Sequence, residues 1–293
     1  MAKRFWIRQN LLVIGALLAI YIIWGSSYIA MRFAIESYPP FMMAAIRFGV
    51  SGLLLFVSLM LTNQKPPSIN EWVGAALVGF FLLVLGNALV AYAELKVSSS
   101  FAALAVATVP IWMALFGLLW NEKPTRLEWA GIAIGTVGII LLNFGNPIHA
   151  TFLTGSLVFV AAASWALGSI LIKRVPMPRG SMASAAQMLM GGIILSIVSI
   201  LQGEKWPINP SMRSILSLGY LIVFASLIAY SAYMFLLTRV RPFLATSNTY
   251  VNPVVAMILG VSIGNERVTP LEYMALGIII VGVVLILSFE NRS

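Results

Sequence analysis

The sequence contains no cysteine and no aspartate, and its only histidine is His149. Disulfides, thiol chemistry, cysteine-based zinc sites and aspartate-based calcium loops are therefore excluded. One histidine cannot form an imidazole metal cluster, and without aspartate there is no Ser-His-Asp triad. A G-x-x-x-x-G-K-[ST] segment is also missing, which excludes ATP hydrolysis by a P-loop. These absences predict a protein that is not an enzyme and that uses neither a cofactor nor a metal.

Charged residues are scarce as well. Asp, Glu, Lys and Arg make up 9% of the chain, against roughly 25% in soluble domains, and 60% of the residues are hydrophobic. Apolar runs of about 20 residues predict helices that cross a membrane. We expect ten of them, near residues 11–31, 41–61, 72–95, 99–120, 127–143, 155–172, 182–201, 213–236, 242–263 and 271–289. The sequence therefore predicts an all-α integral membrane protein.

The chain carries an internal duplication. Trp24 recurs as Trp165, and the block 121–129 recurs as 265–273 with the same order of Asn, Glu, basic residue, Thr, Leu and Glu. Because each copy holds five predicted helices, an odd number, the second copy must enter the membrane upside down. Inverted repeats are typical of secondary transporters. We therefore expect a first repeat of five helices in residues 1–147 and a second, inverted one in residues 152–293.

Lys and Arg are unevenly divided between the two predicted sides of the membrane. If the amino terminus is cytoplasmic, 12 of the 18 basic residues lie on that side and six on the other, which favours two cytoplasmic termini. This topology explains the net charge of +9, so no nucleic-acid partner is predicted. The expected partners are a small-molecule substrate and membrane lipid.

Small residues recur in the predicted fifth and tenth helices. Gly131, Gly135 and Gly138 share the fifth helix, and Gly277 and Gly282 lie in the tenth. Glycines let helices approach closely in a membrane. They predict packing against neighbouring helices or a dimer contact, so the expected oligomeric state is a monomer or a homodimer.

Two tryptophans lie deep in predicted helices. Membrane tryptophans usually belong to the interfacial belt, whereas Trp24 and Trp165 lie well inside the first and sixth helices. Their recurrence at equivalent places in inverted repeats favours two aromatic walls that face a central cavity. Helix packing is the alternative, and the residues alone do not separate the two interpretations.

Pro110 and Pro253 occupy matching places in the fourth and ninth helices. A proline inside a helix frees a carbonyl and kinks the chain, so both places are candidate contacts for a polar solute. A kink satisfied by neighbouring helices is the alternative. With the two tryptophans, the candidate substrate-binding residues are Trp24, Ser26, Asn87, Tyr92, Thr108, Pro110, Trp112, Trp165, Tyr230, Asn248, Tyr250, Asn252 and Pro253.

Two charges fall within predicted helices. Arg47 lies about two turns into the second helix and Glu94 near the outer end of the third. Charges inside a membrane mark functional sites and usually have a partner. The two residues are candidates for a gating or coupling pair, and Glu94 is a candidate proton carrier. A fixed structural bridge is the alternative.

These motifs together resemble a known family. The start Trp24-Gly25-Ser26, the pair Pro39-Pro40 followed by Arg47, and the repeated block 121–131 are similar to the EamA-type ten-helix branch of the drug/metabolite transporter superfamily. The resemblance covers essentially the whole chain. It implies two inverted five-helix repeats, cytoplasmic termini, a bacterial inner-membrane location, and a central cavity from which amino acids or related metabolites are exported by alternating access. Cavity tryptophans matter in aromatic amino acid exporters of the superfamily, and Trp24 and Trp165 match them.

The expected function is therefore a secondary exporter of amino acids or related small amphipathic metabolites. A broad-specificity efflux carrier for drugs or toxic compounds is the first alternative, and a membrane subunit that depends on a partner protein is the second. The first-helix glutamate of small multidrug exporters is missing from this chain, which argues against their proton-antiport mechanism here.

Overall fold

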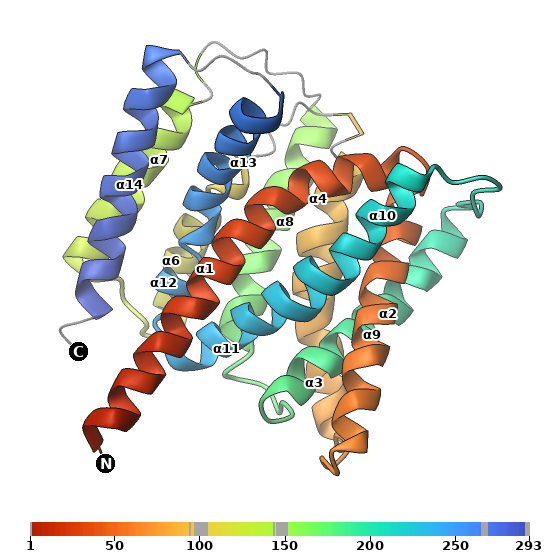
Figure 1. Cartoon of the computed structure of the whole chain (residues 1–293). Helices are drawn as coiled ribbons and strands as arrows, with labels where there is room; N and C mark the ends of the chain where they lie inside the picture. The colour runs from red at the N-terminus through yellow and green to blue at the C-terminus, as the bar shows by residue number, and fades with distance from the viewer. Residues whose placement is uncertain are drawn as a thin grey trace.

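The computed structural model describes residues 2–93, 95–96, 105–142, 144, 152–264 and 269–290. Within these ranges the chain forms ten helical segments and no strand, which confirms the predicted all-α fold (Figure 1). The first half comprises α1 (Ala2–Ile35), α2 (Pro40–Leu61), a third segment made of α3 (Ile69–Gly79), η1 (Phe80–Ala88) and α4 (Leu89–Ala93), then α6 (Val109–Leu119) and α7 (Arg126–Leu142).

The second half repeats this order. It comprises α8 (Phe152–Leu171), α9 (Ser181–Leu201), a third segment made of α10 (Met212–Tyr220), η2 (Leu221–Tyr230) and α11 (Ser231–Arg239), then α12 (Pro242–Ala245) with α13 (Asn248–Gly264), and α14 (Pro270–Glu290).

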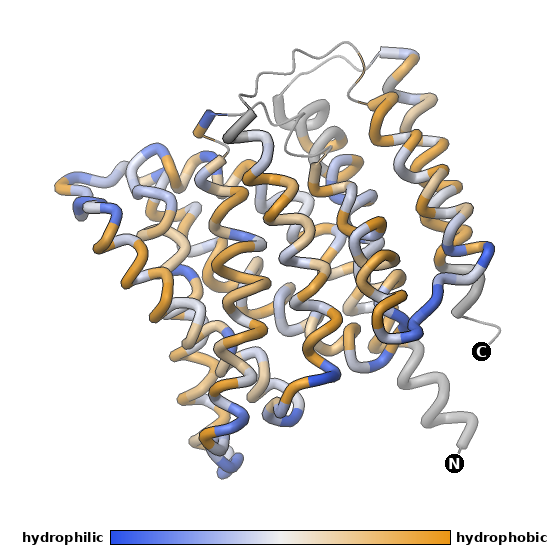
Figure 2. Tube along the Cα trace, turned by 180° about the vertical axis from the view of Figure 1, so that it is seen from behind, coloured by the Kyte–Doolittle hydropathy of each residue, from blue (hydrophilic) through white to orange (hydrophobic). Residues whose placement is uncertain are grey.

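The helices are built to face lipid. Five of them are long and apolar enough to cross a membrane, over Leu11–Ile35, Pro40–Leu61, Ile69–Ala93, Ser181–Leu201 and Met212–Arg239. Large apolar side chains such as Leu18, Ile22, Leu53 and Ile197 are exposed on their outer faces. Figure 2 shows hydrophobic residues along the helices and hydrophilic residues mainly at the turns. An apolar exterior of this kind requires a hydrocarbon environment.

Equivalent helices of the two halves lie side by side and run antiparallel. On α2 and α9, Gly192 faces Gly49, whereas Gly52 faces Met188, so residue numbers rise on one helix as they fall on the other. The two helices form one pair and α7 with α14 forms another (Figure 1). An antiparallel relation between equivalent helices is what an inverted repeat produces, because the second copy crosses the membrane in the opposite direction.

The same inversion holds for α7 and α14. Gly131 faces Ile286 and Gly138 faces Ile279, and between them the backbones of Gly135 and Gly282 nearly touch. The predicted glycine packing therefore joins these two helices to each other. Gly277 is different, because a Cβ added there would meet nothing within 4 Å.

The remaining helices cross between the repeats. The first helix of each repeat packs against the fourth helix of the other, α1 on α13 and α8 on α6. The third segments also cross, with η1 on α8 and η2 on α1. The space at the centre of the molecule is therefore bounded by elements of both repeats.

Both third segments contain a π-helix at equivalent positions, η1 in the first repeat and η2 in the second. A π-helix closes its hydrogen bonds from residue i to i+5, so its turn is wider than that of an α-helix, and such turns often occur at functional sites. The hydropathy pattern predicts both helices but contains no sign of this local geometry.

The fourth segment differs from the expected continuous helix. The chain turns at Ala107 and Thr108, and Pro110 lies in the first turn of α6. A proline is well tolerated there because the first backbone N–H groups of a helix have no intrahelical acceptor. Pro110 therefore begins a helix rather than kinking one, which corrects the expectation. Pro253 does lie inside a helix, α13.

Gly192→Ala is expected to destabilise the protein by about 1–3 kcal/mol through overpacking. The added Cβ would lie 2.6 Å from the Cα and N atoms of Gly49, and backbone atoms cannot rotate away, so α2 and α9 would have to separate. The measurement is the midpoint of thermal unfolding in detergent.

Gly49→Ala is the matched control at the same crossing, because its Cβ would meet nothing within 4 Å. It should unfold at or above the wild-type temperature, since alanine favours a helix over glycine by about 1 kcal/mol. Equal midpoints for the two variants would contradict the close crossing.

Candidate functional site

A cavity lies between the two repeats, where α1, α2, η1, α8, η2 and α13 meet. Its accessible volume is about 90 Å³, several times the 10–15 Å³ needed to hold one water molecule. Seven of the sequence-predicted residues line it: Trp24, Arg47, Asn87, Trp165, Tyr230, Asn248 and Asn252. The structure thus brings together residues that lie more than 200 positions apart in the chain.

The cavity extends from the middle of the bundle toward one end. We name the two ends by the chain: the N end is where α1 begins, and the far end is where α1 turns into α2. Along α1 the lining runs from Trp24 to Met31, in the second half of the helix, and along α2 it consists of Arg47 and Phe48, near the helix start. The cavity therefore lies on the far-end side of Trp24.

Three aromatic side chains end the cavity on its N-end side, and we call them the aromatic floor: Trp24, Trp165 and Tyr233. The two indoles meet edge to face with ring centroids 5.5 Å apart. Tyr233 lies 5.2 Å from Trp24 and 5.4 Å from Trp165. Edge-to-face pairs of this kind contribute about 0.5–1.5 kcal/mol beyond their buried area, so the floor is a stable contact between the repeats.

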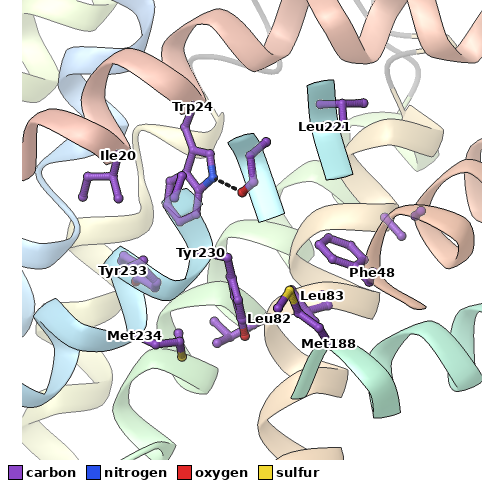
Figure 3. Packing of buried hydrophobic residues seen from close by; sticks show 14 of the residues in the cluster. Ile20, Trp24, Phe48, Leu82, Leu83, Met188, Leu221, Tyr230, Tyr233 and Met234 are labelled. Atoms are coloured by element: carbon purple, nitrogen blue, oxygen red, sulfur yellow. Dashed lines mark hydrogen bonds between the residues drawn. The ribbon is translucent and has the colours of Figure 1, made fainter. Parts of the chain in front are cut away.

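Each floor indole also has a hydrogen-bond acceptor. The Trp24 Nε1–H donates to the backbone oxygen of Ala225 in η2 at 3.0 Å (Figure 3). The Trp165 Nε1–H donates to the Tyr233 hydroxyl at 3.0 Å, and that hydroxyl also meets Ser169 Oγ at 2.6 Å. The two tryptophans therefore occupy equivalent places with different partners, and both the wall and packing interpretations describe what they do.

Arg47 forms the charged part of the wall, although it is only 4% exposed. Its Nε–H donates to Ser226 Oγ in η2 at 2.7 Å, and its Nη1 lies 3.5 Å from Asn87 Oδ1 in η1. The guanidinium carbon stands 4.7 Å from the centre of the Phe48 ring. One side chain thus connects the π-helical segments of both repeats.

The predicted partner of Arg47 lies outside the described residues. Glu94 is not among them, so the gating or coupling role proposed for the pair stays a prediction. Among the described residues, the ion pairs are Arg174 with Glu122 and Arg241 with Glu128, and neither includes Arg47.

Two asparagines on α13 contribute amide groups to the cavity wall. Asn248 is 4% exposed and Asn252 is 3% exposed, and the Oδ1 atom of each is buried with no hydrogen-bond partner among the described residues. Tyr230 is also buried, but its hydroxyl donates to the side-chain oxygen of Gln187. The two asparagines therefore have unused hydrogen-bonding capacity next to the cavity, whereas Tyr230 does not.

Seven predicted residues do not line this cavity: Ser26, Tyr92, Thr108, Pro110, Trp112, Tyr250 and Pro253. Ser26 meets the Tyr220 hydroxyl at 2.6 Å, and Tyr92 stacks on Phe41. Thr108 donates to the Ala105 backbone oxygen, and Trp112 stacks on Phe116. These contacts are to neighbouring helices or to the residue's own segment. The roles of the seven residues in substrate binding stay predictions that this geometry does not support.

Helical periodicity explains which residues face inward. On α13 the lining residues are Asn248, Thr249 and Asn252, whereas Tyr250 and Pro253 lie on other faces of the helix. Tyr250 instead contacts α7, where its hydroxyl approaches the Ile132 backbone oxygen at 3.3 Å. Residues three, four and seven positions apart share a helix face.

The same rule identifies lining residues that the sequence analysis missed. Ser27, Tyr28 and Met31 follow Trp24 by three, four and seven positions, and all three line the cavity. On the third segment, Leu83 and Val90 flank Asn87 in the same way. Helical spacing from Trp24 or Asn87 was the signal that could have found them.

The N end of the bundle is closed by charged contacts between three connections. Arg241, just before α12, binds Glu128 of α7 with Nε–Oε1 at 2.6 Å and Nη2–Oε2 at 2.9 Å. Arg174, after α8, binds Glu122 at 2.6 Å. Glu128 is 1% exposed and also accepts the Thr125 N–H in a capping box at the start of α7. The aromatic floor and these ion pairs both lie between the cavity and the N end.

The comparisons with known proteins agree with this architecture. The profile of the EamA-like transporter family matches residues 11–144 and 153–288, one match in each repeat. The chain therefore belongs to the EamA-like transporter family. It is 46% identical over 280 residues to a protein of Escherichia coli (strain K12) named "Uncharacterized inner membrane transporter YedA", covering 95% of this chain and 92% of the relative. The protein is thus a membrane transporter, and this family membership supports a role other than catalysis.

More distant relatives share the same length and fold. A second protein of Escherichia coli (strain K12), named "Probable amino-acid metabolite efflux pump", is 23% identical over 90% of this chain and 91% of its own. A solved crystal structure superposes with a TM-score of 0.76 at 20% identity, covering 94% of this chain and 96% of the other. At that identity the superposition shows the fold alone.

Glu128→Ala is expected to loosen the N end. Because the chain has no cysteine, Ser247→Cys can report on this region: Ser247 is fully buried and meets the Tyr21 hydroxyl at 2.6 Å. With Glu128 removed, Arg241 loses a buried acceptor, so the thiol introduced by Ser247→Cys should react several times faster with a maleimide. The measurement is the labelling rate in detergent.

The matched control is Glu71→Ala in the same cysteine background. Glu71 occupies the equivalent position in a capping box at the start of α3, with Ser68 as its hydrogen-bond partner. Both substitutions remove a cap worth about 1 kcal/mol, but only Glu128→Ala breaks the contact to Arg241. Equal labelling rates in the two variants would show that the ion pair does not hold this end closed.

Proposed function

We propose that the protein is a secondary transporter that exports amino acids or related small amphipathic metabolites by alternating access. The observation that carries the proposal is the central cavity, which has an aromatic floor on one side and a buried arginine with amide groups on the others. A wall that is part aromatic and part polar suits a solute with one apolar part and one polar head. The name of the efflux pump relative is consistent with this class of substrate.

The inverted repeats supply the means of alternating access. Two repeats that are related by an axis in the membrane plane can exchange conformations, which closes one end of the site as the other opens. In this structure the aromatic floor and the ion pairs lie on the N-end side of the cavity. In the alternate state we expect these contacts to separate, while the helices around Arg47 and Asn87 close.

We place the protein in a bacterial inner membrane with both termini in the cytoplasm. The excess of Lys and Arg on the N-end connections supports this orientation, and the inner-membrane relative supports the location. The N end would then be cytoplasmic and the cavity would lie toward the outside. Lipid and the solute are the proposed partners, with the chain acting as a monomer or a homodimer.

A broad-specificity efflux carrier is the second candidate function. The aromatic floor would suit many apolar compounds, but Arg47 places a positive charge in the wall, which disfavours the cationic drugs that such carriers often export. A lipophilic cation in the substrate panel separates the two candidates.

Single cysteines are expected to report the orientation directly. Gln64, between α2 and α3, and Lys205, between α9 and α10, are both exposed and lie at opposite ends of the bundle. In intact cells a membrane-impermeant maleimide should label Lys205→Cys, and Gln64→Cys should react only after the membrane is permeabilised. The reverse pattern would place the termini outside.

Counterflow in liposomes tests the transport function. Liposomes that contain only this protein should take up labelled neutral or aromatic amino acids faster when the same solute is inside. Trp24→Ala and Trp165→Ala should each lower the apparent affinity, because losing a buried aromatic surface costs about 1.5–3 kcal/mol, roughly tenfold to hundredfold.

Trp129→Ala is the control, because Trp129 lies on α7 and is 42% exposed, away from the cavity. It should leave uptake unchanged. Uptake of a lipophilic cation alone would favour the drug carrier, and no uptake of any solute by folded protein would contradict the proposal or reveal a missing partner subunit.

A further inference from the structure

We propose that Arg47 binds the carboxylate of the transported solute, so that the cavity selects α-amino acids and related carboxylates over their neutral derivatives and over amines. The inference rests on the proposed function and names the group by which the site would recognise its substrate.

The first argument is the cost of the buried charge. An arginine side chain does not lose its proton inside a protein, and a buried charge is costly unless it is paired. Arg47 is 4% exposed, and no ion pair among the described residues includes it. Of the described residues that line the cavity, Arg47 is the only one with a charged side chain. The site therefore carries a net positive charge that an anion would neutralise.

The second argument is the geometry of the guanidinium. Its Nε–H is engaged by Ser226, and the long contact of Nη1 to Asn87 uses at most one further donor. Nη2 has no hydrogen-bond partner among the described residues. The Phe48 ring supports the guanidinium group from one side. A planar group held in this way keeps donors available for the paired hydrogen bonds that arginine forms with a carboxylate.

The third argument is the pair of asparagines on α13. The Oδ1 atoms of Asn248 and Asn252 are buried without a partner among the described residues, and a buried acceptor left unpaired costs about 1–3 kcal/mol. A carboxylate does not satisfy these oxygens, but an ammonium group does. Arg47 on α2 and the asparagines on α13 therefore offer complementary groups for the two charges of a zwitterion.

The rest of the wall suits the remaining part of such a solute. Trp24 and Trp165 present aromatic rings at the floor, and Val106, Val109 and Ala161 add apolar surface. An amino acid bound with its charges at Arg47 and α13 would rest its side chain on this surface. The polar contacts would then select the backbone atoms of the solute, which all α-amino acids share, and the apolar surface would accept different side chains.

The test is a ligand series on the unaltered protein. For one amino acid that the carrier accepts, we would compare the amino acid, its carboxamide and the decarboxylated amine, using both ligand-induced thermal stabilisation in detergent and counterflow in liposomes. A charged hydrogen-bond pair is worth about 1.5–3 kcal/mol, so the amino acid should bind about tenfold to hundredfold more tightly than its carboxamide. This comparison does not depend on whether any variant folds.

Variants then assign the preference to Arg47. Arg47→Gln should reduce the ratio of amino acid to carboxamide affinity to near one, and Arg47→Lys should retain part of it, because lysine keeps the charge but not the planar fork. Arg213→Gln is the matched control, since Arg213 is an exposed arginine on α10, and it should leave the ratio unchanged.

The outcomes separate this inference from the proposed function. Counterflow of amino acid and carboxamide at equal affinity would overturn the role of Arg47 and leave the transporter function standing. Binding that prefers the carboxylate, without any counterflow, would support Arg47 and contradict export. Failure of folded protein to bind any member of several such series would overturn the inference.

Discussion

The antiparallel crossing of equivalent helices is the contact on which the rest of this structure depends. At Gly49 with Gly192, and at Gly135 with Gly282, the two repeats meet backbone against backbone. Lipid offers no hydrophobic driving force for helices to associate, so close van der Waals packing at small residues has to hold them together. These crossings, α2 on α9 and α7 on α14, leave the other helices free to enclose a cavity between the repeats.

The cavity joins chemistry that neither repeat provides alone. Arg47 comes from the first repeat but is held by Ser226 of the second, and the floor consists of Trp24 from one repeat with Trp165 and Tyr233 from the other. Any motion of one repeat against the other changes these contacts directly. Binding and conformational change are therefore coupled through the same few side chains, which is the requirement for alternating access.

The repeats are equivalent in fold but not in chemistry. Trp24 donates to a backbone oxygen of η2, whereas Trp165 donates to a tyrosine hydroxyl. Arg47 has an uncharged residue, Met188, at the matching position of the second repeat. The pseudo-symmetric scaffold thus holds an asymmetric site, with one cationic wall and one wall of amides. That asymmetry allows a solute to bind in a defined orientation.

The sequence by itself determined the ten helices, the duplication and its inversion, because hydropathy and self-similarity are read directly along the chain. It also indicated Trp24, Trp165 and Asn87 as deep residues. Only the tertiary structure decided which side chains face the centre: Ser26, Tyr92 and Tyr250 turn to neighbouring helices, while Ser27 and Met31 line the cavity. A helix that is apolar on all sides has no polar face to mark its inner side, so helix packing alone assigns that side.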